Sequence, residues 1–243
     1  MPIDNETGDD GGLRNRRKLY GRRKGKPLRA SQERLMAEVL PSLKVNLGDT
    51  EARPGALEPA EIFGRLPAQF WLEIGFGGGE HLAHQAIENP DVGIVGCEPF
   101  VNGIAMLLSR LEREEIGNVR VHPSDARDLI DRLPDGALDK AFLLYPDPWP
   151  KARHHRRRFM NPENLRPLAR AMRAGAELRL ATDIPDYMEH ALEAVGQCSG
   201  LLELAAPVAT GRDNAWLDWP GTRYEAKAIR AGRVPQYATF RRV

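Results

Sequence analysis

The sequence predicts an α/β fold: a mostly parallel, twisted sheet with helices on both faces and an antiparallel last strand. Two observations support this fold class. From residue 70 onward, short apolar runs alternate with segments of helical periodicity. The first apolar run leads through a glycine-rich turn into the first helical segment, an arrangement that binds ligands at the carboxyl edge of a parallel sheet. A chain of 243 residues, 42% of them hydrophobic, can bury one large core of this kind.

The chain divides into three predicted parts. Residues 1–27 are polar, glycine-rich and charged, and we expect them to form a basic, disordered tail. Residues 28–60 should contain a helix, with Ser31 as its N-cap and Pro41 at its end, followed by a connecting loop. Residues 61–243 should form the α/β domain itself.

Within the domain, strands and helices are expected to alternate in sequence order. The expected strands span 70–74, 92–97, 119–122, 138–145, 176–181 and 237–242, and the expected helices span 80–88, 101–115, 126–133, 162–174 and 187–194. Helical connections between parallel strands make right-handed crossovers, which place helices on both faces of the sheet.

The net charge of +1 conceals a strong segregation of charge. Residues 13–29 hold nine Lys/Arg, Lys151–Arg158 hold five more, and residues 223–242 hold six against a single acid. The remainder of the chain is acidic. Basic clusters on an acidic body predict a polyanionic partner, because clustered cations bind phosphates and release their counterions.

Other features exclude several classes of protein. No apolar run approaches the roughly 18 residues of a membrane span, and the N-terminus lacks the apolar region of a secretory signal. The two cysteines, Cys97 and Cys198, lie far apart without histidines at metal-ligand spacing. We therefore expect a cytoplasmic protein with no metal, no membrane association and no obligate protein partner.

The first strand–turn–helix unit predicts a cofactor site. Gly75, Gly77 and Gly79 let the backbone turn sharply and approach a ligand closely. Their spacing is G-x-G-x-G, whereas a dinucleotide fold needs G-x-G-x-x-G with a pyrophosphate on the helix N-terminus. Glu73 and Glu80 flank the turn, and these acids suit a cationic sulfonium with an α-amino group better than a pyrophosphate.

Acids also follow the next two predicted strands. Glu98 ends the second strand, where a doubly wound fold places a carboxylate that accepts hydrogen bonds from ribose hydroxyls. Asp125 follows the third strand and can accept from the adenine amine, while the backbone of Ala126 can donate to a ring nitrogen.

The fourth strand ends in a rigid turn with a single acid. Two prolines enclose Asp147, and Trp149 follows, so both side chains should project into the crevice beside the sulfonium. The basic run that comes next favours a nucleic-acid substrate, since it would hold phosphates beside the reacting base.

Four motifs together resemble one family. They are Leu72-Glu-Ile-Gly-Phe-Gly, Tyr145-Pro-Asp-Pro-Trp-Pro-Lys-Ala-Arg-His, Ala181-Thr-Asp and Gly221-Thr-Arg-Tyr-Glu225. In these motifs, and from about Phe70 to the C-terminus, the chain resembles the bacterial tRNA (guanine-N7-)-methyltransferases, which are Rossmann-like class I methyltransferases. The resemblance implies transfer of a methyl group from S-adenosylmethionine to N7 of a tRNA guanine, the one in the variable loop.

The resemblance also implies roles for individual residues. Cofactor contacts would come from Glu73, Gly75, Gly77, Gly79, Glu98, Asp125, Ala126 and Asp147. The guanine or its nucleotide would be bound by Lys151, Asp183, Thr222, Arg223, Tyr224 and Glu225, and RNA by Arg153, His154, His155, Arg156, Arg157 and Arg158. Asp147 would be the catalytic residue. The family often has Lys-Phe where this chain has Arg223 and Tyr224.

Two other functions remain open at this point. The Pro-Asp-Pro-Trp turn is similar to the Asp/Asn-Pro-Pro-aromatic turn of amine methyltransferases, which act on adenine, glutamine or cytosine nitrogens. Alternatively, the chain is a non-catalytic RNA-binding protein that has this fold. Such a protein is expected to lose its cofactor acids, whereas all four expected here are present.

Overall fold

The computed structural model describes residues 20–21, 23–48 and 57–243. Over this part of the chain, eight strands form one sheet in the order β3-β2-β1-β4-β5-β8-β6, and β7 pairs with β8 outside this path. The strands are β1 (Gln69–Ile74), β2 (Val92–Cys97), β3 (Val119–His122), β4 (Leu138–Leu144), β5 (Met172–Thr182), β6 (Leu202–Leu204), β7 (Ala209–Thr210) and β8 (Gln236–Arg242). The mostly parallel α/β fold predicted from the sequence is confirmed.

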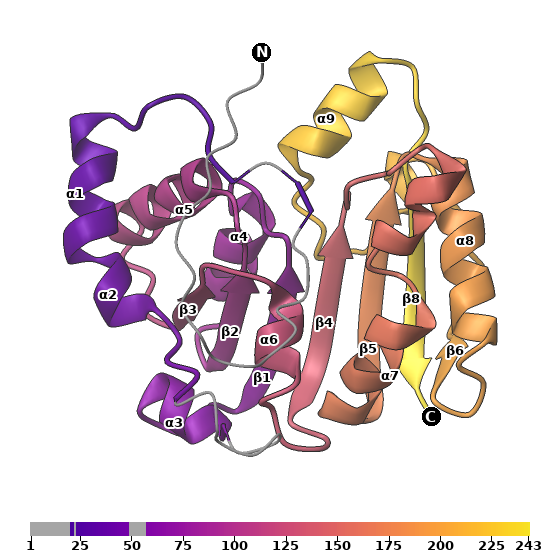
Figure 1. Cartoon of the computed structure of the whole chain (residues 1–243), viewed down its shortest axis with the longest axis horizontal. Coiled ribbons are helices and arrows are strands. Elements are labelled where there is room, and N and C mark those ends of the chain that lie inside the picture. Colours follow the sequence, from indigo (N-terminus) through magenta and orange to yellow (C-terminus); the bar gives the residue numbers. More distant parts are fainter. Residues whose placement is uncertain (1–19, 22, 49–56) are drawn as a thin grey trace, which may run out of the picture.

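Helices connect the strands on both sides of the sheet. They are α1 (Ala30–Glu38), α2 (Leu40–Leu43), α3 (Pro59–Phe63), α4 (Glu80–Glu88), α5 (Val101–Arg113), α6 (Ala126–Ile130), α7 (Pro162–Ala171), α8 (Pro185–Gly196) and α9 (Arg223–Arg230), with the 3-10 helices η1 (Ala152–Arg157) and η2 (Arg212–Asn214). Figure 1 shows α1 and α5 at one end of the sheet and α8 at the other.

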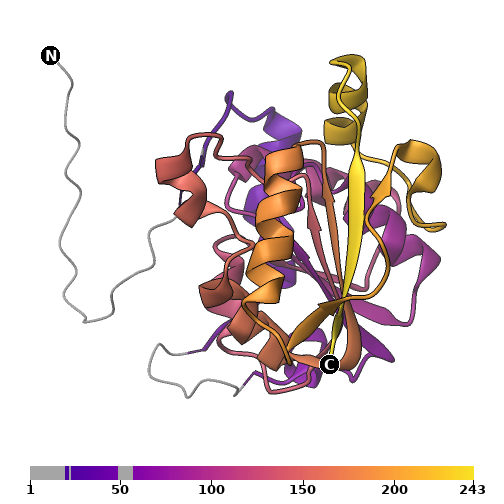
Figure 2. The same cartoon turned by 90° about the vertical axis from the view of Figure 1, so that its right-hand side faces the viewer.

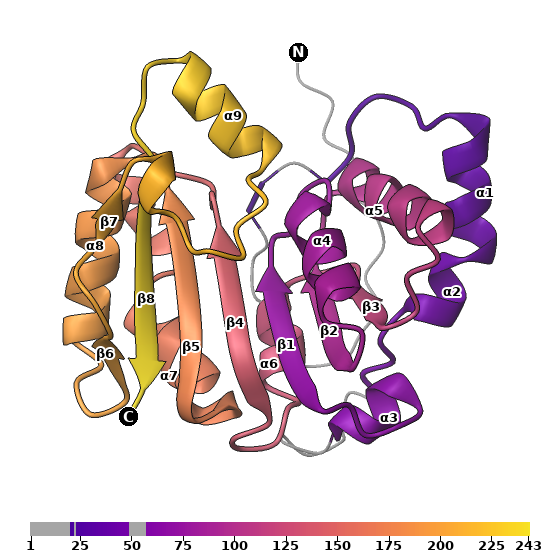
Figure 3. The same ribbon diagram turned by 180° about the vertical axis from the view of Figure 1, so that it is seen from behind.

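The parallel strands all end at one edge of the sheet. β1 pairs in parallel with β2 on one side and with β4 on the other, so the order of strands reverses between β1 and β4. Ligands bind in the crevice at such a switch point. β8 runs antiparallel to β5, as expected for the last strand, and Figure 3 shows it beside β5. Helix α9 stands beyond the carboxyl edge of the parallel strands (Figures 1 and 2).

The sheet separates two hydrophobic cores. One lies under α6, α7 and α8, where Leu72 and Ile74 of β1 face Leu129, Leu165 and other buried side chains. The second lies under α1, α4 and α5, where Trp71 of β1 belongs to the buried cluster. Because strand residues alternate between faces, this division determines which side each residue of β1 faces.

The local structure differs from the sequence predictions at several places, three of which change how an element begins or ends. The N-cap of α1 is Arg29 rather than Ser31, and Gln32 closes a capping box on it. Pro41 lies in the first turn of α2, where proline is tolerated, and so does not end the helical region. The helix predicted over 162–174 ends at Ala171, because Met172 is buried and pairs with Leu138 as the first residue of β5.

Candidate active site

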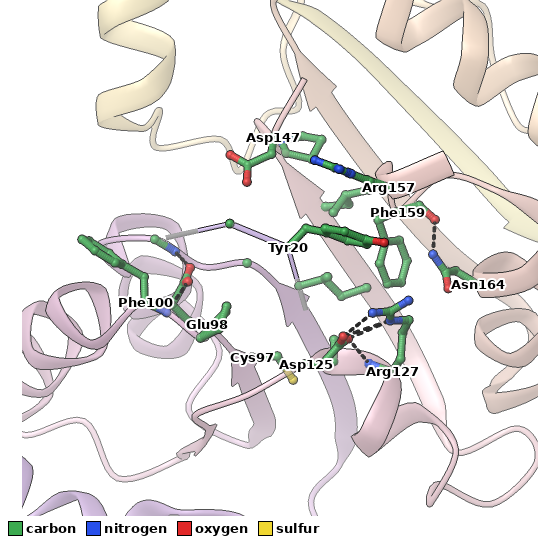
Figure 4. A pocket seen from close by; sticks show the side chains of 18 of the residues that line it. Tyr20, Cys97, Glu98, Phe100, Asp125, Arg127, Asp147, Arg157, Phe159 and Asn164 are labelled. Atoms are coloured by element: carbon green, nitrogen blue, oxygen red, sulfur yellow. Dashed lines mark hydrogen bonds and ion pairs between the residues drawn. The ribbon is translucent and has the colours of Figure 1, made fainter. Parts of the chain in front are cut away.

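A cavity of about 440 Å³ opens at the carboxyl edge of the sheet. Its walls come from the glycine-rich turn after β1, the ends of β2 and β4, the start of α6, the segment around η1, and the N-terminal segment (Figure 4). Three carboxylates line it: Glu98, Asp125 and Asp147. The structure thus brings together acids that the sequence places at the ends of three different strands.

The glycine-rich turn gives the cavity a wall of bare backbone. Gly75 and Gly77 line it with φ values of 74° and 57°, which only glycine adopts without strain. A Cβ atom on Gly77 would lie 2.9 Å from Cε2 of Tyr224, so the ring of Tyr224 packs directly on this turn. Gly79 is the N-cap of α4, packs beside Leu107 and is not among the residues that line the cavity.

Glu98 is held firmly at the end of β2. Its side chain lies in the cavity wall, and the residue is only 8% exposed. Oε2 accepts a hydrogen bond from the backbone N–H of Gly77 at 2.8 Å, and Oε1 accepts one from that of Phe100 at 2.9 Å. Burial raises the pKa of this carboxyl above its ordinary value, and the two N–H donors partly offset that shift. Each oxygen keeps a lone pair for a further donor.

Asp125 is the N-cap of α6 and already has a partner. Its Oδ1 accepts from the backbone N–H of Arg127 at 3.0 Å, and its carboxylate forms an ion pair with the guanidinium of the same residue. Ala126 is buried in the adjoining wall, and the side chain of Arg127 also lines the cavity. Sequence reasoning missed Arg127, because an arginine in a helix's first turn carries no signal of its own.

The turn after β4 is strained on both sides of Asp147. Tyr145 has φ 50° and Trp149 has φ 44°, and non-glycine residues rarely adopt such values except at functional sites. The surrounding protein partly desolvates the Asp147 carboxylate, and this raises its pKa above the ordinary value. Trp149 lines the cavity and contacts Arg157, whose guanidinium lies 4.9 Å from its ring centroid.

The N-terminal segment closes one side of the cavity, which the sequence did not predict. Tyr20 and Gly21 line it, and Figure 4 shows the Tyr20 ring beside Arg157, 4.4 Å from its guanidinium. Asn102 of α5 anchors the segment: its Oδ1 accepts from the N–H of Gly25 at 2.7 Å, and its Nδ2 donates to the carbonyl of Lys26 at 2.7 Å. Residues 1–19 and 22 of the predicted tail lie outside the described residues.

Glu73 is not among the residues that line the cavity. It lies on the same face of β1 as Trp71, opposite the cavity-lining Ile74, and its exposed fraction is 2%. Its Oε2 lies 2.7 Å from Nδ1 of His81, and this pair is buried under Phe142 and Trp219. Because successive side chains of a strand point to opposite faces, the position of Glu73 directly before Ile74 could have predicted this orientation.

The residues predicted to bind guanine lie around α9 and the end of β5. Asp183, just after β5, forms an ion pair with Arg233. Thr222 is the N-cap of α9, and its Oγ1 accepts from the backbone N–H of Glu225 at 3.1 Å. The side chain of Glu225 itself is 2% exposed.

The two residues between Thr222 and Glu225 pack α9 against the glycine-rich turn after β1. Arg223 forms an ion pair with Glu80, at the start of α4, while Tyr224 reaches the cavity. Lys151 is exposed at the N-cap of η1 and does not line the cavity.

The basic residues of η1 and its C-cap differ in their surroundings. Arg156 and Arg157 line the cavity, whereas Arg153 is exposed on the outer surface. Arg158, predicted to contact RNA, is 1% exposed: it donates to the carbonyl of Pro148 at 3.0 Å and forms an ion pair with Asp186. Arg158 therefore anchors the turn after β4 from inside the protein.

The two histidines of η1 are partly buried. His154 contacts the ring of Trp149 edge-on, with centroids 6.0 Å apart. His155 packs against His190, with centroids 5.8 Å apart, and lies 3.6 Å from Asp186. His154 thus contacts the strained turn, whereas His155 contacts α8.

Two further features concern the described residues alone. No helix among them is long and apolar enough to cross a membrane. No cluster of three or more His, Cys, Asp or Glu side chains among them has the arrangement of a metal site.

The doubly wound sheet, its glycine-rich turn and the acids at the ends of β2 and β3 define a class I, S-adenosylmethionine-dependent methyltransferase. Solved structures share this fold. A 16S rRNA methyltransferase, KamB, is 15% identical and superimposes with a TM-score of 0.55 over 78% of this chain and 100% of that one. An antibiotic-related methyltransferase is 14% identical, with a TM-score of 0.53 over 76% of this chain and 92% of that one.

Sequence comparison identifies the family within this class. A family model described as "Putative methyltransferase" matches residues 67–236. The tRNA (guanine-N(7)-)-methyltransferase of Paracoccus denitrificans is 56% identical, covering 93% of this chain and 95% of its own length. That of Jannaschia sp. is 54% identical over 94% of this chain and 96% of its own. The chain belongs to the tRNA (guanine-N(7)-)-methyltransferase family.

Proposed function

We propose that this chain transfers the methyl group of S-adenosylmethionine to N7 of a guanine in the variable loop of tRNA, in the cytoplasm, using the cavity described above. The observation that carries the proposal is the position of three carboxylates, Glu98, Asp125 and Asp147, around bare glycine backbone at the switch point of the sheet. Arg127, Arg156 and Arg157 also line the cavity, so its net charge is balanced, but individual carboxylates suit a cofactor that bears a sulfonium and an ammonium group.

The residues present fit this cofactor. Both oxygens of Glu98 are fixed by backbone N–H groups and keep lone pairs, so the carboxylate can accept from two neighbouring ribose hydroxyls. The backbone N–H of Ala126 would donate to the adenine ring. Asp125 would accept a hydrogen bond from the adenine amine once its ion pair with Arg127 rearranges. Arg127 also lines the cavity and would stay close to the adenine. Asp147 lines the same cavity and would interact with the amino end of the cofactor.

The reaction at N7 needs no general base. S-adenosylmethionine supplies a methyl group on a positively charged sulfur, and guanine N7 carries a lone pair in the ring plane and no proton. The protein therefore has to align the two groups and stabilise the guanine ring as it becomes cationic. We assign the electrostatic part to Asp147, whose partly desolvated carboxylate acts more strongly than one in water.

The base itself would be bound between β5 and α9. Asp183 and Glu225 are acceptors for the N1–H and N2 amine of guanine, with Thr222 and the neighbouring helix start completing the pocket. Asp183 forms an ion pair with Arg233. If Asp183 binds the base, Arg233 would lie beside the base or its phosphate. Tyr224, which lines the cavity, and the exposed Lys151 and Arg223 would contact the target nucleotide.

The exposed basic residues would bind the tRNA backbone. Arg153 and Arg156 of η1 and Lys227 and Arg230 of α9 are exposed, and both elements lie at the carboxyl edge of the sheet. Phosphate contacts of this kind hold an RNA in register without reading its sequence.

Analysis of the reaction product tests the proposed function. The protein is incubated with labelled S-adenosylmethionine and unmodified tRNA, and the methylated nucleoside is identified by mass spectrometry and mapped by cleavage. We expect 7-methylguanosine at one position in the variable loop. A methylated adenine or cytosine amine would show that the chain acts as an amine methyltransferase. Failure to bind the cofactor in calorimetry would favour a non-catalytic RNA-binding protein.

A further inference from the structure

The carboxylate of Glu225 has an unusual, one-sided environment. It lies in the first turn of α9, and its side chain is 2% exposed. Two side chains donate to the same oxygen, Oε1: the indole Nε1–H of Trp219, at 2.9 Å, and the hydroxyl of Tyr237. The two donors hold one oxygen of this buried carboxylate in a fixed position.

The second oxygen, Oε2, faces a different way. Its cationic neighbour, Nε of Arg212, lies 4.0 Å away, beyond hydrogen-bond distance, on a side chain that is 61% exposed. A Cβ atom on Gly221 would lie 2.9 Å from Oε2, so this oxygen points at the loop that leads into α9. Both lone pairs of Oε2 therefore remain for a ligand that enters beside this loop.

Rigid elements hold the two donors in place. Tyr237 lies on β8 opposite Ala181 of β5, two residues before Asp183, so strand pairing fixes its hydroxyl relative to the other proposed guanine acceptor. The ring of Trp219 packs against His81, Trp216 and Tyr237, with centroids 5.3, 5.6 and 5.9 Å away. A carboxylate held this way cannot exchange its two oxygens by rotation without losing both hydrogen bonds.

We propose that Tyr237 and Trp219 are positioning residues for base recognition. By occupying Oε1 of Glu225 they leave Oε2 as the acceptor for the guanine N2 amine. This inference rests on the proposed function, since it requires that Glu225 contacts the base. Neither residue belongs to the motifs that carry the family resemblance.

The test compares two tRNAs that carry guanine or inosine at the target position. Inosine lacks the N2 amine but keeps N7, O6 and N1–H. For each protein variant, the ratio of kcat/KM for the two tRNAs measures how strongly the amine is recognised. We expect the unaltered protein to prefer guanine by about tenfold or more, since a hydrogen bond to a charged group contributes at that level.

The variant Tyr237→Phe keeps the ring and removes the donor. We expect it to lose most of the preference for guanine, while its affinity for S-adenosylmethionine stays close to that of the unaltered protein. The lost hydrogen bond to a buried carboxylate should also lower the melting temperature, but the guanine-to-inosine ratio compares two tRNAs on the same folded variant. The matched control is Thr239→Val, which removes the acceptor of the Trp216 Nε1–H bond (2.9 Å) on the same strand without touching Glu225. The control should retain the full preference. If Tyr237→Phe fails to fold, Trp219→Phe replaces it and should lose part of the preference.

The variant Glu225→Gln separates this inference from the proposed function. Loss of the guanine preference in Glu225→Gln together with Tyr237→Phe supports both. Loss in Glu225→Gln alone, with the preference intact in Tyr237→Phe and Trp219→Phe, overturns the positioning role and leaves Glu225 as a base contact. A full preference in Glu225→Gln removes Glu225 from base recognition, and the inference with it. Equal losses in Tyr237→Phe and Thr239→Val also overturn the inference, because they indicate a general effect on packing.

Discussion

In the proposed mechanism, the charge of a single side chain, Asp147, acts on both the cofactor and the methylated base. Two prolines and two residues with positive φ hold it in a turn whose shape an asparagine can keep. Backbone strain is concentrated in this turn, and Arg158 anchors it from below through the carbonyl of Pro148. A strained, anchored turn is what an electrostatic role requires, since stabilisation comes from groups that need not move.

Replacement of this carboxylate tests its role. Asp147→Asn should lower the single-turnover rate at least about tenfold and weaken cofactor binding, because the negative charge facing both cations is lost. Between about pH 6 and 9 the rate of the unaltered protein should stay level, since N7 has no proton to remove. Asp91→Asn, at the opposite edge of the sheet, should leave the rate unchanged. A log-linear rise across this window, abolished in Asp147→Asn, would contradict the assignment and indicate an amine or hydroxyl substrate.

Acidification should weaken cofactor binding by protonating Asp147. Partial desolvation raises the pKa of Asp147, so on acidification it takes up a proton at a higher pH than an ordinary aspartate does. Burial raises the pKa of Glu98 in the same direction. Affinity for the cationic cofactor, measured by calorimetry, should therefore begin to fall above the pH at which ordinary carboxylates titrate. In Asp147→Asn this fall should be shallower, and an unchanged curve would remove Asp147 from the cofactor site.

Two neighbouring arginines should behave oppositely when truncated. Arg158→Ala should lower the free energy of unfolding by about 1.5–3 kcal/mol, because loss of the buried guanidinium leaves two carbonyls and Asp186 without a donor. Arg153→Ala should keep the stability and weaken tRNA binding, since Arg153 is exposed. Denaturant unfolding and filter binding measure the two effects. If Arg158→Ala instead weakened tRNA binding and left the stability intact, Arg158 of the unaltered protein would have to contact RNA rather than stay buried.

At the scale of elements, sequence patterns predict the sheet well and its junctions poorly. The bounds of α4, β2 and β3 agree with the prediction, because each has a clear period and a glycine or acid at its end. The start of β5 does not, because Met172 continues a helical pattern locally and only its pairing with Leu138 makes it a strand. Helix α3 was likewise hidden in a stretch that reads as a loop.

In the candidate site, too, the sequence predicts residues that local patterns locate and misses residues that tertiary contacts position. Glu98 and Asp147 line the cavity as expected, because strand ends locate them. The burial of Arg158 could not be predicted, since its partner Asp186 lies on another element and a basic run resembles a solvated surface. Tyr20 gave no signal either: it is a lone aromatic residue in a polar tail, and its ring packs on Trp149 and Arg157, which are distant in sequence.

The attachment of the N-terminal segment to α5 can be tested at its anchor. Asn102→Ala removes both hydrogen bonds to the segment, one from Gly25 and one to Lys26. We expect cofactor affinity to fall by roughly fivefold, because loss of the order in this wall costs about 1 kcal/mol. The matched control on the same helix is Ser109→Ala, whose hydroxyl bonds only to the carbonyl of Ala105. Equal cofactor affinity in both variants would show that the segment does not contribute to the cofactor site.

At the scale of the whole molecule, positive charge and the cavity occupy the same edge. The exposed basic residues of η1 and α9 lie at the carboxyl edge of the sheet. Residues 1–19, which lie outside the described residues, hold four further Lys/Arg and four acids. The rest of the chain is acidic, so a polyanion approaching from any other side meets repulsion. If the proposed function holds, this arrangement should orient a tRNA with its target base toward the cavity before any base contact forms.

The contribution of the first residues can be isolated by salt titration. A chain that begins at Tyr20 lacks four Lys/Arg but keeps Tyr20 and Gly21 in the cavity wall. Its affinity for tRNA should be lower, and the slope of log affinity against log salt should decrease by about 0.7–0.9 for each phosphate that is no longer neutralised. Cofactor affinity should not change. Residues 1–19 also hold Asp4, Glu6, Asp9 and Asp10, so the truncation leaves the net charge unchanged. A full-length variant with the four Lys/Arg replaced by Gln keeps these acids, so its slope should decrease at least as much as that of the truncated chain. An identical slope for all three proteins would assign tRNA binding to η1 and α9 alone.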